Sequence, residues 1–211
     1  MANLGSDFGV IGNTEVTSTN KGRTYGAEFL AQQKLSKGFY GLVAVTLFRS
    51  EFQDINLKYT PSSWDSKLII SATAGKKFGK NWELGAKWRF TGGTPFTPID
   101  SATSSLIAVW NTNGIGLPNY KLLNSQRLGV FHQLDMRLDK KWYLKKLNID
   151  LYADVQNVYA FKYKSVSYLD VVRDTNGNPI ISSVNPLSYQ TQFIENLNGT
   201  VLPTIGLVIE M

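Results

Sequence analysis

Apolar and polar residues alternate with a period of two over long stretches of this chain. The clearest stretch is LNIDLYADVQNVYAF (147–161), in which Leu147, Ile149 and Leu151 are separated by polar residues. A strand sends successive side chains to opposite faces, whereas a helix needs apolar residues three and four positions apart. The pattern therefore predicts a strand whose two faces lie in different surroundings.

The same alternation predicts seven long strands. We expect them at about residues 22–35, 38–52, 65–78, 81–92, 125–142, 146–161 and 199–211. Ordinary strands have about 5–6 residues, whereas a strand that crosses a bilayer needs about 9–11. In 38–52 both faces are apolar, so the sequence does not orient that strand.

The predicted connections are alternately short and long. The short ones are 36–38, 79–81 and 143–147, and the long ones are 53–64, 93–124 and 162–198. In an up-and-down sheet this alternation places every tight turn at one end, as in outer-membrane barrels with short periplasmic turns and long extracellular loops. Aromatic residues also stand near both ends of the apolar face, as in the interfacial girdles of such barrels; they are Trp82, Trp142, Trp88, Phe90, Tyr159 and Phe161.

Composition narrows the class of protein. The 211 residues carry a net charge of +6 and include one histidine and no cysteine. Disulfides and thiolate metal sites are thereby excluded, and no apolar run is long enough for a transmembrane helix. The lysines and arginines are dispersed, so we expect no nucleic-acid partner. The first residues, MANLGSDFGV, show no signal-peptide pattern, so an exported chain would be mature or a fragment.

Four stretches resemble segments of one family, the TonB-dependent outer-membrane receptors. They are YGAEFLAQQKL (25–35), RFTGGTPFTP (89–98), DLYADVQNVY (150–159) and LPTIGLVIEM (202–211). Their order agrees with the family's last strands, and the richness in Tyr, Asn and Lys resembles Bacteroidetes members. The resemblance extends from about residue 21 onward.

The resemblance implies an all-β, antiparallel, up-and-down transmembrane β-barrel. Residues 21–211 would be about seven C-terminal strands of a 22-stranded barrel, and residues 1–20 the tail of an extracellular loop. The family's plug domain and coupling box have no counterpart here. Seven is an odd number for a barrel, and the chain ends in Met211 where an aromatic residue is more usual.

The implied function is energy-coupled uptake of a nutrient, of the siderophore, glycan or peptide class, across the bacterial outer membrane. The implied partners are outer-membrane lipid, the nutrient, the plug domain with the remaining strands, the TonB complex through the missing N-terminal part, and a surface lipoprotein. Two alternatives stay open. One is a small eight-stranded outer-membrane protein, an adhesin or barrel enzyme with its first strand in 1–20. The other is a soluble β-barrel binding module.

Catalytic chemistry has little support in the sequence. There is no nucleophile elbow, phosphate loop or metal-ligand spacing, so we predict neither enzyme activity nor a cofactor. His132 falls on the apolar face and reads as an interfacial residue. Charged residues on the opposite face are predicted to line the lumen, where pairing across strands is favoured over an acid pair or cation site; they are Glu83, Lys87, Arg89, Asp135, Arg137, Asp139, Asp150 and Asp154.

The long loops are the better candidates for ligand binding. Exposed aromatic, amide and charged side chains suit sugar, peptide or siderophore-like ligands. The candidates are Asp100, Trp110, Asn111, Asn113, Tyr120, Tyr168, Asp170, Arg173 and Tyr189. The alternative is that the loops pack on one another or contact a surface lipoprotein.

Overall fold

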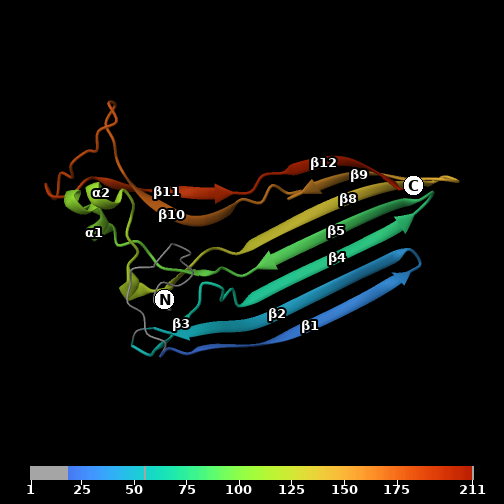
Figure 1. Ribbon diagram of the computed structural model, residues 1–211, viewed down its shortest axis with the longest axis horizontal. Helices are drawn as coiled ribbons and strands as arrows, with labels where there is room; N and C mark the ends of the chain where they lie inside the picture. Colours follow the sequence, from blue (N-terminus) through green and yellow to red (C-terminus); the bar gives the residue numbers. More distant parts are fainter. Residues whose placement is uncertain (1–18, 55, 211) are drawn as a thin grey trace.

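A computed structural model describes residues 19–54 and 56–210. Its main element is one antiparallel sheet of long strands, which confirms the all-β prediction (Figure 1). Of the predicted loop tail at 1–20, residues 1–18 lie outside the described part of the chain.

Seven long strands form the sheet in an order that follows the chain. They are β1 (Gly22–Ser36), β2 (Phe39–Gln53), β4 (Leu68–Phe78), β5 (Trp82–Thr91), β8 (Phe131–Tyr143), β9 (Asn148–Gln156) and β12 (Leu202–Glu210). Each is antiparallel to its neighbours, and the short β3 (Tyr59–Pro61) pairs with β2. Within the described residues β1 and β12 are open edges, so no closed barrel is present and the 22-stranded barrel remains a prediction.

Five predicted strands are longer than the observed ones; 65–78, 81–92 and 199–211 exceed β4, β5 and β12 by a few residues at their ends, and 125–142 and 146–161 exceed β8 and β9 by more. β8 begins at Phe131 instead of about 125, because Gln126–Arg127 forms the separate strand β7, which pairs with β6 (Pro95–Phe96). β9 ends at Gln156 instead of 161, because Asn157 has a φ of 55° and turns the chain out of the sheet.

All three tight turns lie at one end of the sheet, as does the end of β12, and all long connections lie at the other (Figure 1). Lys37 and Gly38 join β1 to β2 with φ angles of 49° and 78°. Positive φ at both central residues is what a two-residue hairpin turn requires. We call the two ends the tight-turn end and the long-loop end.

The strand register gives the sheet one apolar and one polar face. Directly paired residues point to the same face, and the pairs Val43–Ala72 and Tyr40–Gly75 place Val43 on the apolar face and Tyr40 on the polar face. This orients the strand that the sequence left open. The apolar face carries Ala27, Phe29, Val43, Val45, Leu47, Ile70, Ala72, Ala86, Trp88, Leu134, Met136, Ile149, Leu151, Ile205 and Leu207.

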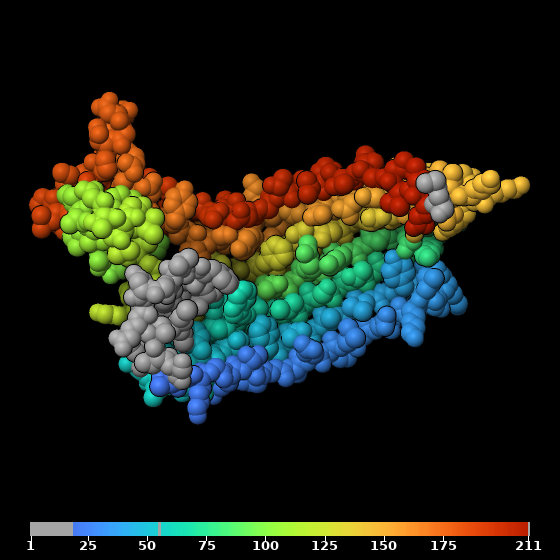
Figure 2. Space-filling model, viewed as in Figure 1, coloured from blue at the N-terminus to red at the C-terminus, as the bar shows by residue number. Residues whose placement is uncertain are grey.

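No hydrophobic core lies under this sheet. Among the described residues only Trp110, Leu169 and Val171 are buried hydrophobic residues, and all three lie outside the seven long strands. Leu47 and Leu207 are 55% and 59% exposed. A folded monomer of this mass exposes about 9,800 Å², whereas this chain exposes 14313 Å². Figure 2 accordingly shows strands lying side by side in the open, with bulk gathered only at the long-loop end.

Two tyrosines lie over glycines of the neighbouring strand on the polar face. Tyr40 of β2 pairs with Gly75 of β4, and Tyr152 of β9 pairs with Gly206 of β12. A Cβ at either glycine would lie 2.2 Å from the tyrosine ring. Rings that cover glycines in this way are a known device for holding adjacent strands together.

The long-loop end contains regular elements that the sequence did not predict. They are α1 (Ser101–Ser105), α2 (Ile107–Asn113), a 3-10 helix (Tyr120–Leu122) and the hairpin of β10 (Tyr163–Val171) and β11 (Thr191–Asn198). Ile99 and Tyr189 pack against the small core of Trp110, Leu169 and Val171. No helix in the described ranges is long and apolar enough to cross a membrane.

Candidate functional site

The charged residues predicted to line a lumen share the polar face of the sheet. On that face, β5 and β8 place the like charges of Glu83 and Asp139 side by side, and the opposite charges of Lys87 and Asp135. The full set is Glu83, Lys87, Arg89, Asp135, Arg137, Asp139, Asp150 and Asp154. The prediction that these residues lie together on one face agrees with the register, and what that face meets remains a prediction.

Near the tight-turn end, Glu83 is the centre of a polar network. It accepts a 2.7 Å hydrogen bond from the Tyr40 hydroxyl and a 3.4 Å bond from the Lys141 ammonium group. Lys141 also lies 3.8 Å from a carboxylate oxygen of Asp150. Lys141 therefore contacts carboxylates of two different strands, and Lys77 lies 4.0 Å from Glu83 as a second cation.

Further along the face, two arginines pair with aspartates on β8. Arg137 contacts Asp139 at 2.7 Å, and its guanidinium group lies 3.8 Å from the centre of the Tyr152 ring. Arg89 contacts Asp135 at 3.0 Å. Only the Arg89–Asp135 pair joins two strands, whereas Arg137 and Asp139 are both on β8, so the expected cross-strand pairing of Arg137 with these aspartates is not observed. Both pairs compensate charge on a half-exposed polar face that has no apolar layer above it.

Some polar groups among the described residues of this face have no hydrogen-bond or ion-pair partner. In the described part of the chain, Lys87 and Asp154 make no ion pair or side-chain hydrogen bond, and the buried Arg89 Nε and Asp150 Oδ1 atoms have no partner. No cluster of three or more acidic or histidine side chains in these residues could hold a metal ion. The unused groups fit contact with water or with another polar surface.

Five of the predicted ligand residues help to build the long-loop end itself. Trp110 is buried at 6% exposure in the loop core, so it is not an exposed contact residue. The Tyr189 hydroxyl donates to the Asn111 side chain at 3.2 Å, and Asn113 Nδ2 donates to a backbone carbonyl within its own helix, α2. Asp100 caps α1, where the backbone N–H and hydroxyl of Thr103 lower the pKa of its carboxyl group.

The other four predicted residues stay accessible but do not meet in one pocket. Tyr168 on β10 is 52% exposed, and the Asp170–Arg173 pair lies near it in sequence with a separation of 3.8 Å. Arg173 also donates to the Gly177 carbonyl at 3.3 Å. Tyr120 lines a different hollow of about 560 Å³, which it shares with Asp54 and Lys58.

A groove of about 620 Å³ at the long-loop end was missed by sequence reasoning. It lies between the β6–β7 pair and the β10–β11 hairpin, and its lining mixes apolar and cationic side chains. Among the lining residues are Phe96, Ile99, Arg127, Lys164, Val166 and Phe193. These residues come from three distant segments, so no local motif could have brought them together. The groove is the best candidate for ligand contact in this chain.

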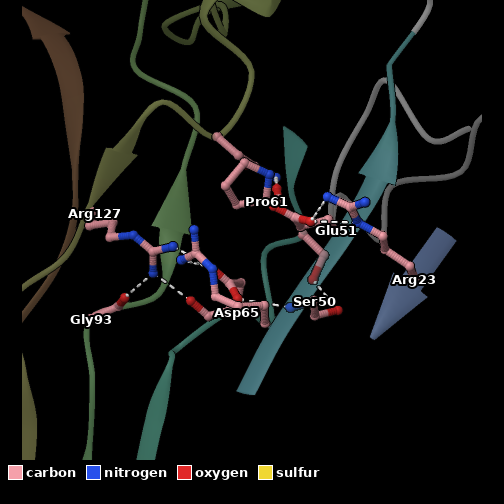
Figure 3. Close-up of polar contacts among 10 residues, drawn as sticks. Arg23, Ser50, Glu51, Pro61, Asp65, Gly93 and Arg127 are labelled. Carbon is pink, nitrogen blue, oxygen red and sulfur yellow. Dashed lines mark hydrogen bonds and ion pairs between the residues drawn. The ribbon is translucent and has the colours of Figure 1, made fainter. Parts of the chain in front are cut away.

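A buried aspartate ties two long connections together at the base of this end (Figure 3). Asp65 is fully buried and accepts a 2.8 Å hydrogen bond from the Ser50 backbone N–H. It forms ion pairs with Arg49, at 3.2 Å, and with Arg127. Arg127 donates in addition to the Gly93 carbonyl at 2.9 Å. The 54–67 and 92–130 connections are therefore held to each other and to β2.

Two buried asparagines fix the connections in the same way. Asn124 Nδ2 donates to the Pro61 carbonyl at 2.8 Å and so joins the same two connections. Asn157 Nδ2 donates to the Phe161 carbonyl at 3.0 Å, and its own backbone N–H donates to Asp135. Nearby, His132 Nδ1 lies 2.7 Å from the Tyr159 hydroxyl, where the apolar face reaches the long-loop end. The long-loop end is thus a preorganised structure on a rigid base.

Comparison with known proteins assigns no family. No family model matches this chain, and no curated protein matches it significantly. The functional interpretation rests on the two faces of the sheet and on the built long-loop end.

Proposed function

We propose that this chain is the C-terminal part of the transmembrane barrel of a TonB-dependent outer-membrane receptor. The whole receptor takes up a nutrient of the siderophore, glycan or peptide class and is not an enzyme. The observation that carries this proposal is the uncovered apolar face of seven strands, each of which has nine or more residues.

Lipid is the partner that this face requires. Burying one large aliphatic or aromatic side chain contributes about 1.5–3 kcal/mol, and in the described residues no layer of protein covers the face. A soluble binding module would bury such a face in its own core. A bilayer supplies the apolar surroundings instead, and strands of 9–15 residues are long enough to cross it.

The two open edges of the sheet are where the remaining strands of the barrel would pair. Unpaired backbone groups are very costly in hydrocarbon, so a sheet in a membrane must close. β1 and β12 each offer one unpaired edge, to which further strands of a 22-stranded barrel would pair. The polar face then meets the lumen, where Lys87 and Asp154 have free capacity to contact the plug domain.

The long-loop end is the site of ligand capture in this proposal. The groove between β6–β7 and β10–β11 offers apolar walls together with Arg127 and Lys164. Energy would come from the TonB complex through the N-terminal part of the receptor. The exposed β10–β11 hairpin, with Tyr168, would be the surface for a lipoprotein partner.

Single-cysteine labelling of intact cells tests this proposal. This chain has no cysteine, so a cysteine placed at Lys80 or at Asn176 is the only one in this part of the full-length receptor, and the unsubstituted receptor gives the background labelling. A membrane-impermeant maleimide should label Asn176→Cys only, because Asn176 lies at the long-loop end and Lys80 in a tight turn. Both should be labelled after lysis.

Three outcomes would contradict the proposal. Labelling of Lys80→Cys alone on intact cells would invert the topology. A heat-resistant, monodisperse monomer formed by this chain alone in detergent would favour the small eight-stranded protein. A chain that stays soluble and folded without detergent would favour the soluble module.

A further inference from the structure

Nine of the 22 basic residues in the chain are lysines in or next to the three tight turns. Lys77 and Lys141 contact Glu83 on the polar face. The other seven are Lys34, Lys37, Lys76, Lys80, Lys140, Lys145 and Lys146. The described carboxylates at this end are Glu83, Asp139, Asp150 and Glu210, which lie on the polar face, and the first three are in ion pairs. Among the described residues, lysines therefore outnumber carboxylates at the tight-turn end.

Two of the lysines lie on the apolar face itself. Lys76 pairs in register with Leu84, and Lys140 pairs with Trp82. The Lys140 ammonium group lies 5.3 Å from the centre of the Trp82 ring and 5.4 Å from that of Trp142. Tryptophan and lysine side by side at the end of an apolar face mark the level of lipid headgroups.

A shallow hollow of about 530 Å³ lies on the sheet, and one of its lining residues, Phe39, pairs in register with Lys76. Small residues, among them Gly41, Ala72, Ala74 and Ala86, form its floor, and the larger side chains of Phe39, Trp88 and Leu134 line it too. Its lining is mainly apolar, which suits a hydrocarbon chain and not a polar ligand.

We propose that the tight-turn end binds an anionic glycerophospholipid, whose headgroup phosphate meets the lysines and whose acyl chain occupies the hollow. This inference rests on the proposed function, because it needs the apolar face in a membrane. Each lysine near an anionic surface adds to the attraction. A zwitterionic headgroup brings its own ammonium group to the same lysines and binds less well.

The test uses the full-length receptor in detergent, titrated with phosphatidylglycerol that carries a fluorescent acyl chain. The variant Lys37→Gln/Lys76→Gln/Lys80→Gln/Lys140→Gln should bind at least about tenfold more weakly. The matched control, Lys58→Gln/Lys67→Gln/Lys121→Gln/Lys162→Gln, removes the same charge at the long-loop end and should bind as the parent does. Replacing the first four lysines with arginine should restore binding.

Two further measurements keep the proposal testable if the glutamine variant folds poorly. High salt should weaken phosphatidylglycerol binding to the unmodified receptor, because exposed charges are screened. Ala74→Phe fills the hollow without changing charge and should also weaken binding severalfold.

Equal affinity for phosphatidylglycerol and phosphatidylethanolamine, equal loss in both lysine sets, or binding of lipopolysaccharide alone would overturn the lipid proposal. Each of these results would leave the proposed function standing, because none of them concerns insertion of the receptor into a membrane. A receptor that fails to enter lipid bilayers at all would instead overturn the proposed function.

Discussion

The sheet and the long-loop end of this molecule are stabilised by different interactions. The long-loop end has a small core of its own around Trp110, and buried polar anchors such as Asp65 and Asn124 hold its segments together. The sheet has ion pairs on one face and exposed apolar side chains on the other. The long-loop end is held by contacts within the chain, including those of Asp65 with Arg49 and Ser50 on β2, whereas among the described residues nothing covers the apolar face of the sheet or pairs with its two edges.

This difference shows where a single substitution should be felt. A change in the long-loop end acts through contacts within the chain, so its effect should not depend on the surrounding medium. If the apolar face meets lipid, as we propose, a change on that face acts through this contact, and its effect should appear only in a bilayer or micelle.

Removal of the buried carboxylate at the base of the long-loop end should have the largest effect. Asp65→Ala leaves Arg49 and Arg127 without their partner and the Ser50 N–H without its acceptor. Breaking a buried ion pair from one side costs about 3–5 kcal/mol. Hydrogen exchange on the full-length receptor should show loss of protection in 54–67 and 92–130, with the strands unchanged.

Glu195→Ala is the matched control for this loss. It breaks the ion pair with Lys164, in which both side chains are at least half exposed. Such surface pairs contribute about 0–1 kcal/mol, so the loops should keep their protection. If Asp65→Ala behaves in the same way, Asp65 is not an anchor.

Arginine substitutions should separate the two faces of the sheet. Leu151→Arg places a charge on the apolar face and should cost about 2–4 kcal/mol in a bilayer. Asp150→Arg, one residue away on the polar face, removes a pairing with Lys141 and should cost about 1 kcal/mol. Refolding of the full-length receptor into vesicles measures both. Equal costs would contradict the assignment of faces.

The smallest expected effect is that of acid pH on the stability of an exposed turn at the long-loop end. The backbone N–H of Asn178, with further donors in the same turn, lowers the pKa of the Asp174 carboxyl group. A lowered folded-state pKa gives stability that is present above the unfolded pKa and is lost as the pH falls through the folded value. Protection of the 174–178 amides should therefore be constant near neutral pH and fall below about pH 4.

Asp174→Asn should abolish this acid dependence and leave the strands unaffected. Acid loosening that persists in Asp174→Asn would assign the effect to another group.

Alternation was enough to predict the long strands and the tight turns, because most of these strands carry apolar side chains on one face and polar side chains on the other. It could not orient β2, in which residues such as Leu42, Ala44 and Phe48 put apolar side chains on the polar face as well. Only the pairing with β4 resolved that strand. The hairpin of β10 and β11 was missed because a register shift between Ser165 and Tyr168 breaks the period of two.

The candidate site was predictable only in part, for a similar reason. Charged residues on the polar face follow from alternation, so their common face was foreseen. The Asp65 cluster joins residues 62 positions apart, and the groove is lined by residues from Phe96 to Phe193. Neither set shares a local pattern. For Trp110 there was a signal, since the apolar run LIAVW (106–110) fits a buried segment better than an exposed one.

The tyrosine rings over Gly75 and Gly206 bear on how the strands find their correct alignment. A slip by two residues leaves every side chain on its own face, so the alternating pattern cannot detect that error. The rings distinguish the two registers: after such a slip Tyr152 would face Thr204 or Val208, and its ring would have to leave the position that it holds over Gly206. Tyr40 would likewise face Thr73 or Lys77 in place of Gly75. Each ring and its glycine therefore favour the observed register over one shifted by two residues.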